Sequence, residues 1–130
     1  EIHDPIPGFH QQLTPKIDRF FEHLRPQTPV VRFNWSVQAY DSLNQHPDHR
    51  VEICATTPLY YRTERQSLTR LPKTGAIAFT IRVYLHPLDK LRAIDRALPS
   101  LLAAIDNTPA SLSAYKGFDE LATALEKYRT

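Results

Sequence analysis

The stretch YYRTERQSLTRLPKTGAIAFTIRVYL, Tyr60 to Leu85, predicts a β-hairpin at the centre of the fold. Its polar, arginine-rich first half runs into LPKTG, in which Pro72 and Gly75 are typical turn residues. Beyond the turn every second side chain is apolar, namely Ile77, Phe79, Ile81, Val83 and Leu85. Because successive side chains of a strand point to opposite faces, we expect these residues to form one buried face.

The segments before the hairpin predict a helix and further strands. Thr14 and Pro15 are typical of a helix start, and apolar residues follow at helical spacing until Pro26. VVRFNWSVQAY, Val30 to Tyr40, is rich in β-branched and aromatic residues and is interpreted as a strand. The polar DSLNQHPDHR that follows is interpreted as a loop, and a shorter strand is expected around residues 51–55.

The segments after the hairpin predict helices. Past Pro87, apolar residues recur at the helical period from Leu88 to Ile105, and Pro99 is expected to bend or split this helix. A last helix is expected around residues 118–128. A helix, then strands, then helices predicts an α+β domain whose antiparallel sheet is covered by helices on at least one face.

Composition limits the classes of protein to consider. The 130 residues, 42% of them hydrophobic, suffice for one packed core, so a single domain over residues 1–130 is expected. A formal charge of +2 gives no indication of binding to nucleic acid or to a membrane surface. Without an apolar run of about 18 residues or a targeting segment, we expect a soluble, cytoplasmic protein. The sequence contains no methionine, so we interpret it as either a processed product or a piece of something longer, and we favour the piece.

The single cysteine and the missing motifs exclude several chemistries. Cys54 alone cannot form an internal disulfide, a multi-cysteine zinc site or an iron–sulfur cluster. It is either a haem thiolate or nucleophile, or a buried small hydrophobic residue; VEICATTP offers no flanking base, which favours the buried residue. GxSxG, Walker, GxGxxG and HExxH motifs are absent, so a nucleotide-dependent enzyme is not expected.

The histidines raise the question of a metal site. His46 and His49 lie three apart, but Pro47 disfavours the helix that would aim both at one ion, and a solvated loop is the preferred interpretation. Surface positions are expected for His10, His23 and His86. His3 precedes the stiff DPIPG turn, which suits an axial ligand whose ring must not swing, although spacing alone favours a structural or exposed histidine.

The arginine run before the turn has two interpretations. In an extended segment Arg62 and Glu64 share a face with Gln66, Arg65 faces the other way, and Arg70 lies near the turn. The run is either a solvated edge strand whose charges prevent edge pairing, or a clamp for the carboxylates of a ligand. The small side chains of Ala76, Ala78 and Thr80 leave room for a flat ligand or for a closely packed helix.

Four segments carry a resemblance to a known family. EIHDPIPG, RFNWSV, LYYRTERQSLTRLPKTGAIAFTIRVYL and AYKGFDEL, in this order, resemble the haem-dependent oxidative N-demethylase alpha-subunit-like family, from residue 1 to about Gly117. The resemblance implies a PAS-like fold, an antiparallel sheet with flanking helices that holds haem b. The family's domain is longer at its N-terminus, so this chain is expected to be the C-terminal part of a haem-binding PAS-like domain, completed by an N-terminal segment or another chain.

The resemblance also implies an activity and its partners. The expected reaction is oxidative N-demethylation of a small methylated amine with dioxygen, which releases formaldehyde and uses electrons from a reductase protein in trans. Two other functions remain open: a haem-binding PAS-like sensor without amine turnover, and a PAS-like interaction module without cofactor.

Site residues follow from the family's motifs. His3 matches the IH motif and is expected to be the proximal iron ligand, the one metal ligand of the chain. The RxERQxLxRLP motif implies propionate-binding roles for Arg62, Arg65 and Arg70. The expected catalytic residues are Glu64, which either orients the arginines or meets a cationic amine, and Asn34, which lines the pocket. Buried core is favoured for Trp35, and packing against the sheet for Tyr115 and Lys116.

Overall fold

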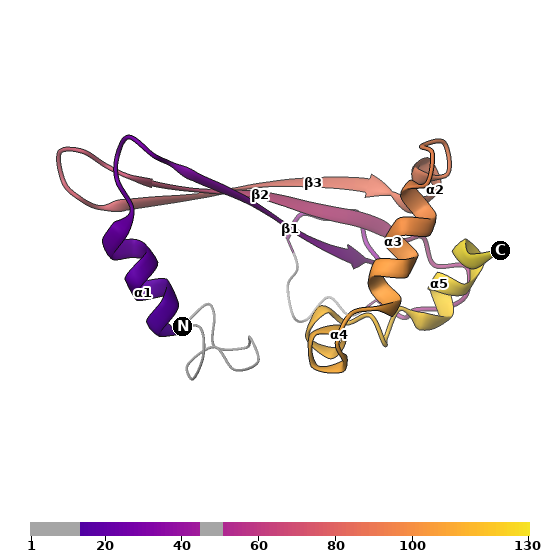
Figure 1. Ribbon diagram of the computed structural model, residues 1–130. Coiled ribbons are helices and arrows are strands. Elements are labelled where there is room, and N and C mark those ends of the chain that lie inside the picture. The colour runs from indigo at the N-terminus through magenta and orange to yellow at the C-terminus, as the bar shows by residue number, and fades with distance from the viewer. Residues whose placement is uncertain (1–13, 45–50) are drawn as a thin grey trace. The chain divides into compact units, whose positions relative to one another are not determined.

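The computed structural model describes residues 14–44 and 51–130 (Figure 1). The elements are α1 (Thr14–His23), β1 (Val30–Gln38), β2 (Tyr60–Arg70), β3 (Ile77–Pro87), α2 (Leu88–Leu91), α3 (Ala97–Asp106), α4 (Ala110–Lys116) and α5 (Ala122–Arg129). The strands form a three-stranded antiparallel sheet in the order β1-β2-β3. This arrangement confirms the α+β prediction, and a PAS-like fold is consistent with it.

The central hairpin forms where the sequence predicts it. The Leu71 N–H donates to the Ala76 carbonyl at 2.8 Å, and the Gly75 N–H donates to the Leu71 carbonyl at 2.9 Å. Gly75 has φ +72°, a left-handed conformation that glycine adopts without a Cβ clash. The LPKTG turn therefore joins β2 to β3 directly.

One register runs the whole length of the hairpin. Next to the turn, Leu71 lies opposite Ala76, and at the far end the Leu88 N–H donates to the Leu59 carbonyl at 2.8 Å. Ser67 and Thr80, whose hydroxyls are 2.5 Å apart, fit the same register midway. The pairing is thus unshifted from one end to the other, and each residue of β2 lies opposite one defined residue of β3.

The chain groups into two compact units that divide the strands between them. Unit 1 consists of the chain up to Asn34 and of Glu64–Arg82. Unit 2 consists of Trp35–Thr63 and Val83–Thr130. Because every strand contributes to both units, the expectation of a single domain stays a prediction.

Unit 2 contains the hydrophobic core. Its buried side chains are Val37, Ala39, Leu59, Leu88, Leu98, Leu101, Leu102, Ile105, Phe118, Leu121, Ala124, Leu125 and Tyr128. In α3 they recur at helical spacing, so that one stripe of the helix is apolar. The Tyr128 hydroxyl accepts a hydrogen bond from the Leu59 N–H at 3.3 Å, which satisfies a buried polar group at the chain's end.

Unit 1 has little apolar core. Leu24 is its buried apolar residue among those described, and Gln66 is buried as well. Phe79 and Ile81 are 41% and 49% exposed, so the prediction that their face of β3 is buried is wrong in this unit. Alternation assigned the residues to one face correctly, but a strand pattern does not reveal whether another layer covers that face.

The helices differ from prediction in three places. The predicted helix breaks at residues 92–96, where Arg96 has φ +59°. Pro99 does not cause the break, because it lies in the first turn of α3, where a backbone N–H has no hydrogen-bond partner within the helix. α4 was not predicted, and α5 begins after Phe118. Within residues 14–44 and 51–130, no helix is long and apolar enough to cross a membrane.

Candidate functional site

The expected iron ligand His3 lies outside the described residues, as do His10, His46 and His49. Among the residues that the structure describes, no group of three or more His, Cys, Asp and Glu side chains could hold a metal ion. A porphyrin iron needs no such group because it takes only one or two protein ligands. Whether this chain supplies a ligand to a haem iron therefore depends on His3, whose role stays a prediction.

Hydrogen bonds define one face of the sheet in unit 1. Arg32 Nε donates to Gln66 Oε1 at 2.5 Å, and Gln66 Nε2 donates to Glu64 Oε2 at 3.0 Å. Gln66, only 6% exposed, thus links a guanidinium on β1 to a carboxylate on β2. The hairpin register places Ile81 opposite Gln66 on this side. We call this side the Glu64 face; it carries Asn34, Glu64, Gln66, Phe79 and Ile81.

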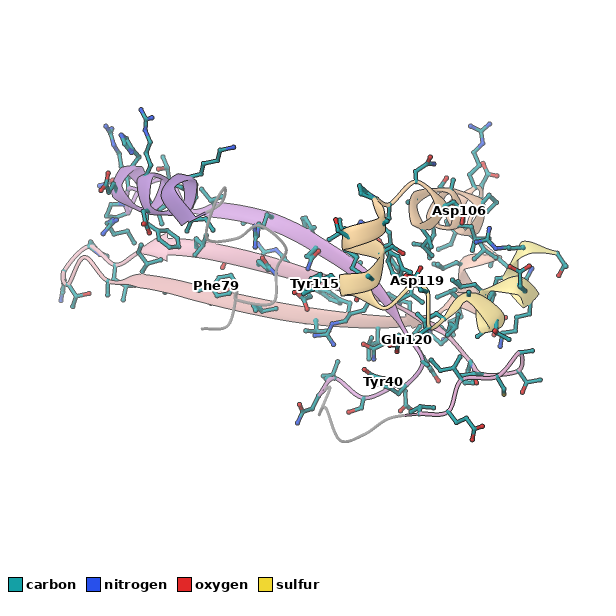
Figure 2. All side chains as sticks on the ribbon, turned by 90° about the horizontal axis from the view of Figure 1, so that it is seen from below. Tyr40, Phe79, Asp106, Tyr115, Asp119 and Glu120 are labelled. Carbon is teal, nitrogen blue, oxygen red and sulfur yellow. The ribbon has the colours of Figure 1, made fainter. Side chains whose placement is uncertain are left out.

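The Glu64 face combines apolar surface with polar groups. Figure 2 shows the Phe79 ring on the sheet. Asn34 on β1 is exposed, and Glu64 is half-buried. A large exposed apolar pair beside a carboxylate and an amide is a surface that a flat apolar ligand with a polar reacting group would cover.

Arg62 belongs to unit 2 and holds the chain after β1. Its Nη1 donates to the Leu43 carbonyl at 3.2 Å and approaches Gln38 Oε1 at 3.5 Å. Gln38 Nε2 in turn donates to the carbonyls of Tyr40 and Ser42, at 2.6 and 3.0 Å. Arg62 therefore braces the loop that follows β1, and its propionate-binding role stays a prediction.

Arg70 caps the end of α1. Its Nε donates to the Leu24 carbonyl at 2.6 Å, its Nη1 to the Gly75 carbonyl at 2.7 Å, and its Nη2 to the Phe21 carbonyl. The last carbonyls of a helix have no partner within it, so the guanidinium satisfies groups that the helix cannot. Arg70 ties α1 to the hairpin turn, and its propionate-binding role stays a prediction.

Arg65 lies on the opposite side of the sheet. It precedes Gln66 on β2, its side chain is exposed, and it points away from Glu64, as the alternation predicts. A carboxylate held on the Glu64 face is consequently out of its reach, and its predicted role toward a propionate remains untested.

Trp35 is partly buried and packs against the core of unit 2. Its ring stacks on Phe118, with centroids 5.7 Å apart and planes 22° from parallel. The Lys116 ammonium lies 4.6 Å from the centroid of the Trp35 ring and donates to the Trp35 carbonyl. These contacts confirm the core interpretation of Trp35 and the packing of Lys116 against the sheet, whereas Tyr115, labelled in Figure 2, is about half exposed.

Cys54 is exposed, so the expectation of a buried residue is wrong, as is that of a strand over residues 51–55. A turn at Ala55–Thr56 brings the thiol beside two hydroxyls, with Sγ 3.1 Å from Thr56 Oγ1 and 3.4 Å from Thr57 Oγ1. Hydrogen bonds from Thr56, then from Thr57, lower the pKa of the Cys54 thiol to about 7. The signal for this lowered pKa in the sequence was the pair of threonines, Thr56 and Thr57, that follows the cysteine closely.

Comparison with known families identifies the chain. A family model described as haem-dependent oxidative N-demethylase, alpha subunit-like, matches residues 1–126. The chain belongs to this family. The family's name associates its members with haem and with an oxidative reaction. The words alpha subunit also associate them with further subunits. The predicted family is confirmed over nearly the whole sequence.

Proposed function

We propose that this chain acts in haem-dependent oxidative N-demethylation of a small methylated amine. The family match over residues 1–126 supports this function. Haem, when bound, supplies the iron at which dioxygen is reduced and the N-methyl carbon oxidised. One oxygen atom leaves in formaldehyde and the other in water, and two electrons and two protons complete the balance.

The observation that carries the proposal is the apolar surface that Phe79 and Ile81 expose on the Glu64 face, among the residues that the structure describes. Phe79 and Ile81 leave apolar surface in water, which is costly unless a ligand or partner covers it. A porphyrin ring is flat and largely apolar, and such a surface suits it. The residues present therefore fit the group, with haem b as the proposed form.

The remaining site residues take proposed roles around this face. His3 is the proposed proximal ligand, on the strength of the family motif. The Glu64 carboxylate, held by Gln66, would accept a hydrogen bond from a cationic amine, and Asn34 lies on the same face to orient it. Arg70 is the proposed propionate partner on this side, and the family motif is the support for proposing the same role for Arg62, in unit 2, and for Arg65.

Electrons must come from outside this chain. The one cysteine supports no iron–sulfur cluster, and no dinucleotide-binding motif is present in the sequence. A separate reductase is therefore the proposed partner, which agrees with the alpha-subunit description. The same proposal includes an additional segment or chain that completes the PAS-like domain. It also includes a cytoplasmic location for the protein.

The test is a visible absorption spectrum of the protein as isolated and after haem addition. We expect a Soret band that is lost in His3→Ala and kept in His86→Ala, because His86 is an exposed histidine on β3. Haem-loaded protein with a reductase should then consume oxygen only when a methylated amine is added. A band without amine-dependent uptake would indicate a sensor, and no band in the unchanged protein would leave an interaction module.

A further inference from the structure

Gln66 is a buried amide held between two charged side chains. Only 6% of the residue is exposed. Arg32 Nε on β1 donates to its Oε1 at 2.5 Å, and its own Nε2 donates to Glu64 Oε2, on the same strand, at 3.0 Å. All three residues belong to unit 1. Gln66 therefore connects a cation on one strand to an anion on the next through a single amide.

The chemistry of Arg32 fixes the orientation of this amide. A guanidinium donates hydrogen bonds and accepts none, so the atom that Gln66 turns toward Arg32 must be its carbonyl oxygen. The NH2 group then faces Glu64. Exchanging the two ends of the amide would place N–H groups against N–H groups at Arg32 and oxygen against oxygen at Glu64. Arg32 thus decides that Glu64 meets a donor.

The consequence of this orientation falls on Glu64. Because Gln66 presents a donor to Oε2, the Glu64 side chain must accept there, as a carboxylate does. The bond also limits rotation of the carboxylate, and with it the directions in which both oxygens accept. Ile81, 49% exposed, lies opposite Gln66 and diagonal to Glu64. A held acceptor beside exposed apolar surface suits a small cation that carries both an N–H group and methyl groups.

Strand pairing explains only part of this arrangement. A link between β1 and β2 needs the bond from Arg32 to Gln66, but not the second bond, because Gln66 and Glu64 lie on the same strand. A buried amide must have partners for both of its ends, and an apolar side chain of similar size would avoid that requirement. A glutamine at this position is better explained if it holds Glu64 in one orientation.

We propose that Arg32 and Gln66 are positioning residues for Glu64, which they hold as the hydrogen-bond acceptor for a methylated ammonium ion. This inference rests on the proposed function and adds to it two residues that act on the substrate only through Glu64. Arg32 does not meet the cation, which its own charge would repel. It contributes by orienting the amide of Gln66.

The test compares two cations that differ in one N–H group. Trimethylammonium can donate a hydrogen bond to a carboxylate, whereas tetramethylammonium has the same charge and cannot. The isotope-labelled full chain is titrated with the chloride of each cation at constant ionic strength. The NMR shifts of the Glu64 and Arg65 backbone amides then give the two dissociation constants. We expect the unchanged protein to bind trimethylammonium about tenfold more tightly.

Loss of either positioning residue should remove this preference. In Gln66→Met and in Arg32→Met the ratio of the two dissociation constants should fall to about twofold, and the double variant should fall no further, because Arg32 acts through Gln66. Removing the Arg32 charge strengthens the attraction of both probes equally, so the ratio does not report it. Arg32→Lys, which keeps a donor for Gln66, should retain most of the preference.

Matched controls lie in unit 2. Thr57→Val removes a buried polar side chain, 7% exposed, that accepts a hydrogen bond from the Cys54 N–H at 2.9 Å. Arg92→Met removes an exposed guanidinium that donates to the Lys127 carbonyl at 3.0 Å. Both changes should lower stability and leave the preference for trimethylammonium unchanged.

The outcomes separate this inference from the proposed function. Absence of a preference in the unchanged protein, an unaltered preference in Gln66→Met, or equal losses in the two controls would overturn the positioning role even if a His3-dependent Soret band is present. A missing Soret band together with a preference that depends on Arg32 and Gln66 would reject the haem proposal and retain the positioning role.

Discussion

Unit 1 and unit 2 share the same three strands but are stabilised in different ways. Among the described residues, every buried apolar side chain except Leu24 belongs to unit 2. Unit 1 depends on hydrogen bonds from Arg32, Gln66 and Arg70 and leaves large apolar groups in water. Unit 1, which has the smaller apolar core, is therefore also the unit that exposes apolar surface on which ligands and partners could bind.

β3 shows the contrast within one strand. Its apolar residues share a single face, yet Val83 and Leu85 in unit 2 are partly buried while Phe79 and Ile81 in unit 1 are exposed. One alternating pattern is thus partly buried in one unit and exposed in the other.

The largest expected effect is in the core of unit 2. Leu88→Ala removes a fully buried side chain, and because its neighbours cannot fill the space we expect a loss of about 3 kcal/mol in the free energy of unfolding. Ile81→Ala, at a half-exposed position of unit 1, should cost less than about 1 kcal/mol. Urea unfolding followed by circular dichroism measures both, and similar losses would erase the distinction between the units.

The next effect tests the polar support of unit 1. Arg70→Lys keeps the charge but loses the fork that reaches three carbonyls, so we expect a loss of about 2 kcal/mol in unfolding free energy. Faster hydrogen exchange in α1 should accompany it. Arg92→Lys is the matched control in unit 2, where the guanidinium donates one bond at 3.0 Å to the Lys127 carbonyl. If the control loses as much, unit 1 does not depend specifically on its hydrogen bonds.

The smallest effect on stability is expected at Cys54, an exposed residue of unit 2. Its pKa of about 7 means that the thiolate fraction rises with pH through neutrality, and the alkylation rate with iodoacetamide should rise with the same midpoint. Thr56→Val removes the largest cause of the lowered pKa and should move the midpoint toward 9. The melting temperature should not change on alkylation. A midpoint near 9 in the unchanged protein would contradict the two hydrogen bonds to sulfur.

Local signals made much of the fold predictable. Pro72 and Gly75 punctuate the hairpin, the alternation in β3 assigns its faces, and Thr14 with Pro15 starts α1 where expected. The orientation of Arg65 away from Glu64 followed from the same alternation. Each of these features depends on neighbours within a few residues, which is the range that a sequence pattern reports.

Long-range features were not predictable. The bonds from Arg70 to Phe21 and Leu24 join residues nearly fifty positions apart, and no periodicity reports them. The position of Arg82 opposite Arg65 depends on the pairing register of two strands, which the pattern of one strand does not report. The break before α3 depends on a backbone conformation at Arg96 that arginine adopts rarely.

A hairpin with one unshifted register is intolerant of single-codon insertions within its strands. One residue added inside β2 or β3 would exchange the two faces of that strand beyond that point. Added between Glu64 and Arg65, or in β3 between the turn and Arg82, it would bring an arginine onto the face of Glu64. An insertion of two would restore the faces at the cost of a bulge, while residues added at the Pro72–Thr74 turn would leave them unchanged. Length variation among natural versions of this hairpin is therefore expected at its turn. A version with one extra residue inside a strand would carry different residues on the two faces of its sheet.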